Sequence, residues 1–302
     1  MDAFEHDLRR YSKTEADDDV ISACLLARGT NMGLGRMGTI SDVAYATLAA
    51  ASDNFIRLET LQAANDVVSN ATAELPIFRY YDIGETVHSS SDGQKFETRL
   101  HTINARHSSK YFGLKKGIVA YTLIANHVSV NARVIGANEH ESHFIFDLLF
   151  NNTTAVQPTI HSTDTHGSNP VNFALLHCFG YQFAPCYRDL YDKVRTSLYG
   201  SKHPSHYRAL ALKPIRKIQR RLIENEWENI QRILLSLALK TTTQFIIVGK
   251  LSAYARKNRI EQGRNDEPEQ RGNQRRPYAI RASAAPSSKP TTIAALFAVA
   301  AL

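Results

Sequence analysis

The spacing of apolar side chains changes near residue 85, and this change limits the folds that the chain can adopt. Before that point, apolar residues recur at helical spacing. Beyond it, 117–127 is a continuous apolar run and 128–135 alternates between apolar and polar residues. Both patterns are typical of strands. The sequence therefore predicts a helical lead followed by a sheet.

Polar side chains mark the expected starts of the lead helices. Ser41 is placed to cap one helix, and Ser52 or Asp53 to cap the next, through about Val68. An oxygen at such a position accepts the free backbone N–H groups of the first turn. Pro76 then ends the helical pattern.

The segments that follow complete an alternation of strands and helices. They are, in order, strands at 85–96, 117–127 and 128–135, a helix at 140–150, a strand at 158–164, a helix at 169–180 and a strand at 181–185. The first of these strands is expected to end near Asp92 and Gly93. The order β-β-β-α-β-α-β predicts an α/β fold with a mixed sheet.

The C-terminal third is predicted to be helical and then disordered. Apolar residues recur at spacings of four and three in 213–239, which predicts one helix there, and a further helix is expected at 243–257. After residue 258 polar residues, Pro and Ala dominate without periodicity, which is typical of disorder. The predicted segments are a helical lead (1–84), a core containing the sheet (85–187), a basic helical insertion (188–258) and a disordered tail (259–302).

Charge is distributed unevenly along the chain. Residues 1–90 carry a net charge of −7, whereas residues 91–302 carry +14. The stretch 188–259 alone has 16 basic and 5 acidic side chains. Such a split predicts a polyanionic partner for the second part, with a solvated basic surface as the alternative.

The cysteines and the chain ends bear on the compartment. The chain has three cysteines, an odd number, and no CxxC pair. This argues against a disulfide framework and favours a cytoplasmic location. The first 20 residues are acidic and contain no signal sequence, and no apolar run is long enough to span a bilayer. The sequence therefore predicts a cytoplasmic protein without a membrane partner.

A glycine-rich motif at 33–38 matches GxGxxG. A dinucleotide site needs a strand before these glycines and a helix after them. A helical segment precedes them here, so a flexible connection between two helices is the preferred interpretation.

Two aspartates are the stronger candidates for a site. Asp92 and Asp164 each lie at the end of a predicted strand and are followed by small residues. In open α/β sheets, sites form at the carboxyl ends of strands. Neighbouring carboxylates need a cation to stay ionised together, and oxygen ligands favour Mg²⁺. Two turn-forming aspartates without a ligand are the alternative.

Histidines near Asp164 suggest zinc as an alternative metal. His161, Asp164 and His166 are a possible zinc set, although His161 and Asp164 do not share a face of a regular strand. The acidic and histidine-rich run 139–143 is expected to open a helix, with Glu139 or His140 available to support a metal site.

Lys, Arg and Tyr residues are interleaved in the basic insertion. Arg216, Lys217, Arg220 and Arg221 lie close together on the predicted helix and are the candidate DNA contacts. Neutralisation of phosphates by Lys and Arg is the main contribution to non-specific DNA affinity. A solvated helix face is the alternative.

Taken together, several ordered segments resemble the catalytic region of the Tn-three family of replicative (class II) transposases. The resemblance extends from about Val20 to Asn258. It is carried by Gly29–Gly35, Ser52–Phe55, Pro76–Asp82, Ser90–Phe96, Ala137–Ser142, Ser162–Gly167 and Lys240–Asn258.

The resemblance implies an RNase H-like catalytic region with an Asp, Asp, Glu triad that binds Mg²⁺, with Mn²⁺ as a substitute. Asp92 and Asp164 match the two aspartates and would be both catalytic and metal-binding. The third glutamate is expected on a helix well beyond Asp164, but the family pattern stops after Asn258, and the tail resembles another reading frame. Large N-terminal DNA-recognition domains are also expected but not found. The chain is therefore predicted to be a truncated transposase with little or no activity.

Partners and alternatives follow from the same resemblance. The intact enzyme would nick transposon ends and join them to target DNA, so its partners would be the terminal inverted repeats, target DNA and a second copy of itself. One alternative is a DNA-binding or dimer-forming fragment that interferes with full-length transposase. Another is an unrelated zinc hydrolase that uses His161, Asp164 and His166.

Overall fold

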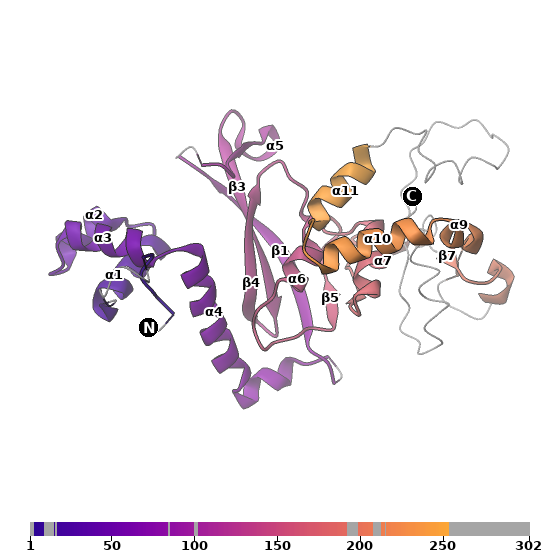
Figure 1. Ribbon diagram of the computed structural model, residues 1–302, viewed down its shortest axis with the longest axis horizontal. Coiled ribbons are helices and arrows are strands. Elements are labelled where there is room, and N and C mark those ends of the chain that lie inside the picture. The colour runs from indigo at the N-terminus through magenta and orange to yellow at the C-terminus, as the bar shows by residue number, and fades with distance from the viewer. Residues whose placement is uncertain are drawn as a thin grey trace. The chain divides into compact units, whose positions relative to one another are not determined.

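The computed structural model describes residues 3–8, 15, 17–83, 85–99, 102–191, 199–207, 213–214 and 216–253 (Figure 1). The described residues divide into two compact units, one within 1–76 together with 153–155 and the other within 77–152 and 156–253. The four segments predicted from the sequence remain a prediction. The predicted disordered tail lies outside the described residues.

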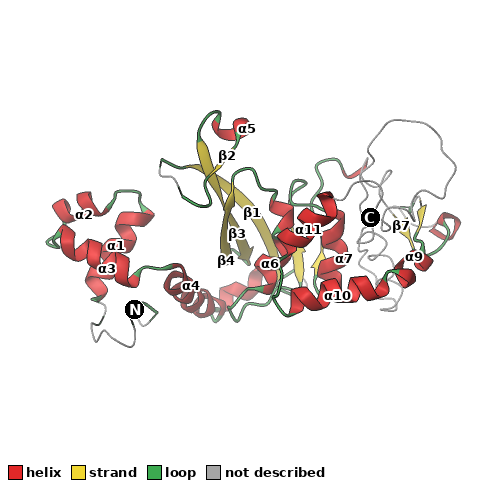
Figure 2. Cartoon of the chain, turned by 45° about the horizontal axis from the view of Figure 1, so that its top comes forward, coloured by secondary structure: helices red, strands yellow, loops and turns green. Residues whose placement is uncertain are grey.

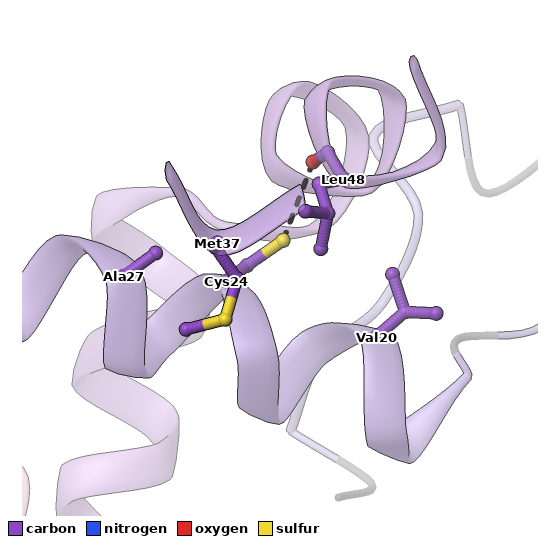
Figure 3. Close-up of a cluster of buried hydrophobic side chains, with 5 residues drawn as sticks. All are labelled: Val20, Cys24, Ala27, Met37 and Leu48. Atoms are coloured by element: carbon purple, nitrogen blue, oxygen red, sulfur yellow. Dashed lines mark hydrogen bonds between the residues drawn. The ribbon is translucent and has the colours of Figure 1, made fainter. Parts of the chain in front are cut away.

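Four helices form most of the first unit. They are α1 (Asp18–Gly29), α2 (Leu34–Ile40), α3 (Tyr45–Phe55) and α4 (Leu58–Ala73). The first begins at Asp17, whose Oδ1 accepts hydrogen bonds from the N–H groups of Asp19 and Val20. Buried apolar side chains of α1, α2 and α3 pack together, and Cys24 Sγ donates to the carbonyl oxygen of Leu48 (Figure 3). The helical secondary structure predicted for this part of the chain is thereby confirmed.

The predicted caps of these helices are wrong. Ser41 follows α2, and both its N–H and its hydroxyl donate to the carbonyl oxygen of Met37, so it ends a helix. Ser52 and Asp53 lie inside α3. The Ser52 hydroxyl is buried, where it accepts a hydrogen bond from Arg28 Nε at 2.8 Å. Ser52 therefore contributes to packing inside α3 and Ser41 ends α2, and neither residue caps the start of a helix.

A six-stranded mixed sheet forms the centre of the second unit. Its strands are β1 (His88–Glu97), β2 (Arg106–His107), β3 (Lys116–Ala125), β4 (Val128–Gly136), β5 (Ile160–Ser162) and β6 (Gln182–Phe183). β3 pairs antiparallel with β1 along one edge and with β2 and β4 along the other, while β5 is parallel to β1 and β6 is parallel to β5. The predicted α/β fold with a mixed sheet is confirmed.

The first strand is longer than predicted. β1 continues to Glu97 because its second half pairs with the start of β3, from Asp92 opposite Thr122 to Glu97 opposite Gly117. Asp92 therefore lies within the strand, not at its end. The boundary between β3 and β4 is a turn at Asn126 and His127, which both have positive φ.

Helices pack beside the parallel part of the sheet (Figures 1 and 2). They are η2 (Glu141–His143), α6 (Ile145–Phe150), α7 (Pro170–Cys178), α10 (Trp227–Ala238) and α11 (Gln244–Ala253). The helix expected at 140–150 is two short helices that meet at Phe144. α7 starts as predicted, because Asn169 Oδ1 accepts the N–H of Val171 and Pro170 occupies the first turn.

The prediction of a single helix at 213–239 is also wrong. It is replaced by β8 (Arg216–Lys217), α9 (Arg220–Asn225) and α10, and β8 pairs with β7 (Tyr199–Gly200). The helical periodicity survives the break at Glu226, because Ile223, Ile230 and Leu237 are all buried. Within the described part of the chain, we find no helix long and apolar enough to cross a membrane.

Candidate functional site

The pairing of β1 with β5 brings the two candidate aspartates to neighbouring positions. The strands are parallel, with Ser90 opposite Ser162. Asp92 lies two residues beyond Ser90, and Asp164 lies two residues beyond Ser162. Because side chains alternate between the faces of a strand, Asp92 lies on the same face as Ser90. Both aspartates are exposed.

Each aspartate carboxylate is oriented by one backbone N–H group. Asp92 Oδ1 accepts from the N–H of Gly93, and Asp164 Oδ1 accepts from the N–H of Gly167, each at 2.8 Å. Among the described residues, no ion pair or further hydrogen bond engages the second oxygen of either carboxylate. Each aspartate therefore has one oxygen available for an external ligand.

A chain of buried polar groups lies on the opposite face of β1. The Tyr121 hydroxyl is hydrogen-bonded to Ser91 Oγ at 2.6 Å, and Ser91 Oγ to His161 Nε2 at 3.0 Å. The other ring nitrogen of His161 is hydrogen-bonded to Ser89 Oγ at 2.9 Å. Burial is the main cause of the raised pKa of Tyr121, and the charges of Glu141, Asp92 and Asp164 add to it. This hydroxyl therefore lies within electrostatic reach of both aspartates.

The buried position of His161 argues against the zinc alternative. Its side chain is fully buried, and both ring nitrogens already have hydroxyl partners. Burial, with a smaller effect from His88, lowers its pKa to about 3, so the ring is neutral near pH 7. Across the described ranges, no group of three or more His, Cys, Asp or Glu side chains is arranged to hold a metal ion.

The residues expected to support a metal site do not approach it. Glu139 Oε2 accepts the N–H of Gly136, and His140 Nδ1 is hydrogen-bonded to Ser142 Oγ. Their neighbour Glu141 lies beside β1 instead, on the face opposite Asp92, since a Cβ atom on Gly93 would lie 2.3 Å from Glu141 Oε1.

Lys95 and Glu141 form an ion pair that the sequence did not indicate. Lys95 Nζ lies 3.0 Å from Glu141 Oε1 and 4.6 Å from the centre of the Tyr111 ring. Burial acts to lower the pKa of Lys95, but the hydrogen bond and charge of Glu141 outweigh it, with help from Tyr111 and Asp92. A lysine three residues after Asp92 was the only signal in the sequence. Lys95 is therefore paired directly with Glu141, and it interacts with Asp92 only through charge.

The other candidate motifs have different outcomes. Gly33 precedes α2, and the segment before it is α1, so the strand that a dinucleotide site requires is missing. The motif is also not a flexible connection, since 34–38 lies within α2.

The four candidate DNA contacts are not on one helix. Arg216 and Lys217 form β8, whereas Arg220 and Arg221 open α9. Lys217, Arg220 and Arg221 are exposed. They remain candidates for phosphate contacts.

Replacement of Gly93 by alanine is expected to lower the free energy of unfolding by about 1–2 kcal/mol. The new methyl group would overlap Glu141 Oε1 and lie 2.7 Å from Val119 Cγ1. Urea denaturation measures the loss. Gly35→Ala is the control, because Gly35 lies in a helix and a Cβ atom added there would have no neighbouring atom within 4 Å. Equal stability of the two variants would contradict the expected close contact.

Comparison with known proteins identifies the family. A sequence profile described as the Tn3 transposase DDE domain matches residues 1–266. The chain belongs to this family. Similar proteins include the transposase for transposon Tn2501 from Escherichia coli, which is 30% identical over 259 residues covering 84% of this chain. The transposase for transposon Tn1546 from Enterococcus faecium is 27% identical over 259 residues covering 85% of this chain.

The Tn3 family relatives are much longer than the matched region. The match covers 25% of the Tn2501 transposase and 26% of the Tn1546 transposase. The chain therefore spans about a quarter of the length of these relatives. Its sequence resemblance to the catalytic region of this family is confirmed by the profile match.

Proposed function

We propose that this chain is the catalytic part of a DNA transposase, acting in phosphoryl transfer on DNA at transposon ends. The observation that carries the proposal is the parallel register of β1 and β5, which brings Asp92 and Asp164 to neighbouring exposed positions. The names of its relatives support the same activity, since they are transposases.

The sheet supports an RNase H-like fold for this part. Leaving out the two-residue β2, the order across the sheet is β4-β3-β1-β5-β6, with β3 antiparallel to its neighbours and the others mutually parallel. Asp92 on β1 and Asp164 just beyond the end of the adjacent strand β5 agree with a site at that position.

The donor atoms at Asp92 and Asp164 fit Mg²⁺. Each carboxylate has one oxygen fixed by a backbone N–H and one without a protein partner among the described residues. Mg²⁺ commonly binds one or two carboxylates together with substrate phosphates, and Mn²⁺ accepts similar oxygen ligands. When bound, such an ion would polarise a phosphate oxygen and lower the pKa of an attacking water.

The chain's own residues would hold and orient this site. The N–H groups of Gly93 and Gly167 fix the two carboxylates, and Lys95 is paired with Glu141 beside them. Two neighbouring carboxylates repel each other and a DNA phosphate, so a cation between them would help DNA to approach. Exposed basic residues, including Lys217, Arg220 and Arg221, would contact the DNA backbone.

The isolated chain is expected to join DNA weakly or not at all. The reason is that the third carboxylate of the triad has no counterpart beside Asp92 and Asp164 in the described residues. The measurement is strand transfer of pre-cleaved transposon ends in Mg²⁺ or Mn²⁺. Robust joining that Asp92→Ala abolishes would overturn the expected inactivity while supporting the site.

A fragment that binds DNA and interferes with full-length transposase is the second candidate. It is favoured by the placement of Lys217 on β8 and of Arg220 and Arg221 on α9, not on the strands beside the two aspartates, because DNA binding need not then depend on the metal site. Salt-dependent DNA binding that Asp164→Ala leaves unchanged, together with no joining, would support this candidate. Absence of DNA binding at low salt would contradict both candidates.

A further inference from the structure

We propose that the connection between β1 and β3, with the strand residues at its two ends (95–99 and 102–116), binds the sugar-phosphate backbone of duplex DNA beside the two aspartates. This β1–β3 connection includes β2 and α5 (Ser109–Phe112). The inference rests on the proposed function, because it takes DNA as the substrate. It assigns DNA contact to a part of the chain outside the basic insertion.

The β1–β3 connection is strongly cationic. It contains six basic side chains and one acidic side chain, Glu97. Glu97 is paired with Lys115 at 2.7 Å. Arg99, Lys110 and Lys116 are exposed, and no carboxylate in the described ranges lies within ion-pair distance of them. An excess of positive charge within one segment is destabilising through self-repulsion, and a polyanion would neutralise it.

The connection is also built as a packed structure. The Phe112 ring lies over Gly117, where a Cβ atom would be 2.1 Å from a ring carbon. The Arg106 side chain packs against Gly136 in the same way, at 2.6 Å from a Cβ position. Lys95 and Lys110 both lie within about 5 Å of the Tyr111 ring. The cations are therefore presented from an ordered scaffold, which lowers the entropy lost on binding.

Two large apolar side chains project from the same connection. Leu114 is 95% exposed and Ile103 is 87% exposed. Such exposure is costly in water without a partner, whereas apolar side chains contact sugars and base steps in DNA grooves. Cations around exposed aliphatic groups therefore match the chemistry of a nucleic-acid surface.

The position of the connection suits a duplex that also reaches the aspartates. β1 carries Asp92 and leads into the connection at Glu97. At about 3.3 Å per residue, Glu97 lies about 17 Å along the strand from Asp92, which is about half a turn of B-DNA. In both views α5 lies at one end of the long strands, and Figure 2 shows β2 beside it.

The test is DNA binding by the full chain in buffer without Mg²⁺, measured by anisotropy of a labelled duplex at several salt concentrations. Arg99→Gln with Lys116→Gln is expected to lower the slope of log K against log salt by about 2, since each lost phosphate contact removes about 0.9. Both side chains are exposed and make no described side-chain contact, so the fold should be unaffected.

The matched control is Arg36→Gln with Lys250→Gln. It removes the same charges from exposed positions on α2 and α11. The control is expected to keep the wild-type slope. Equal slopes for the two double variants would overturn the inference, because only net charge would then matter. If the wild-type chain itself does not bind DNA at low salt, the proposed function is contradicted, and this inference is contradicted with it.

The apolar part is tested separately with Leu114→Ser. This change is expected to weaken binding without changing the salt slope, because no charge is removed. Unchanged affinity would overturn the proposed apolar contact. The cationic contact is tested independently by the Arg99→Gln, Lys116→Gln double variant.

Discussion

Replacement of Gln244 by leucine is expected to lower the free energy of unfolding by about 4 kcal/mol. Gln244 is fully buried at the start of α11. Its Oε1 accepts the N–H of Phe146 at 2.7 Å, and its Nε2 donates to the carbonyl oxygen of Ser142 and to Asn172 Oδ1. Leucine fills a similar volume but removes the partners of the Phe146 N–H and of Asn172 Oδ1, both of which are buried, while the Ser142 carbonyl keeps a hydrogen bond from Asn172 Nδ2.

Chemical denaturation in urea measures this loss. Gln231→Leu is the control, because Gln231 is an exposed glutamine on α10 and its replacement should change stability by no more than about 0.5 kcal/mol. A loss for Gln244→Leu that is no larger than the control would show that water or a shifted side chain replaces the lost hydrogen bonds.

Acidification is expected to destabilise the wild-type protein more than a His161→Gln variant, by about 2 kcal/mol between pH 6.5 and pH 4.5. The pKa of His161 is about 3 in the folded protein, well below the ordinary value of 6.5 for an unfolded histidine. Between these values the unfolded state binds the proton and the folded state does not. Stability is therefore present above about pH 6.5 and is lost as the pH falls.

The comparison is between the slopes of unfolding free energy against pH for the two proteins. Any stability that the substitution itself costs at neutral pH therefore cancels. His88 also has a pKa lowered by burial, but it is present in both proteins. Urea denaturation at several pH values provides the slopes. Parallel curves for the two proteins would mean that His161 is protonated in the folded state or becomes hydrated.

Much of the fold follows from local patterns in the sequence. The apolar run and the alternation that predict β3 and β4 describe strands with one or both faces buried. Asn169 and Pro170 identify the start of α7 because capping depends on neighbouring residues alone. The caps at Ser41 and Ser52 were wrong because packing decided their roles: Ser52 is buried beside Arg28.

The site was only partly predictable. Asp92 and Asp164 were identifiable from their position at the ends of predicted strands, but their proximity depends on the pairing of β1 with β5, between residues 72 positions apart in the sequence. Lys95, Tyr121 and Glu141 could not be found in the same way. Their role depends on which face of the sheet each side chain occupies and on η2 packing against Gly93.

The short parallel pairing of β1 with β5 has a consequence for how this region tolerates insertions and deletions. Only three residue pairs set the register, from His88 opposite Ile160 to Ser90 opposite Ser162. Added or lost residues in the loops between the strands would leave the two aspartates side by side. A single residue gained or lost between Ser162 and Asp164 would instead change the level or face of one carboxylate. Length variation is therefore compatible with this site almost everywhere except within a few residues of its aspartates.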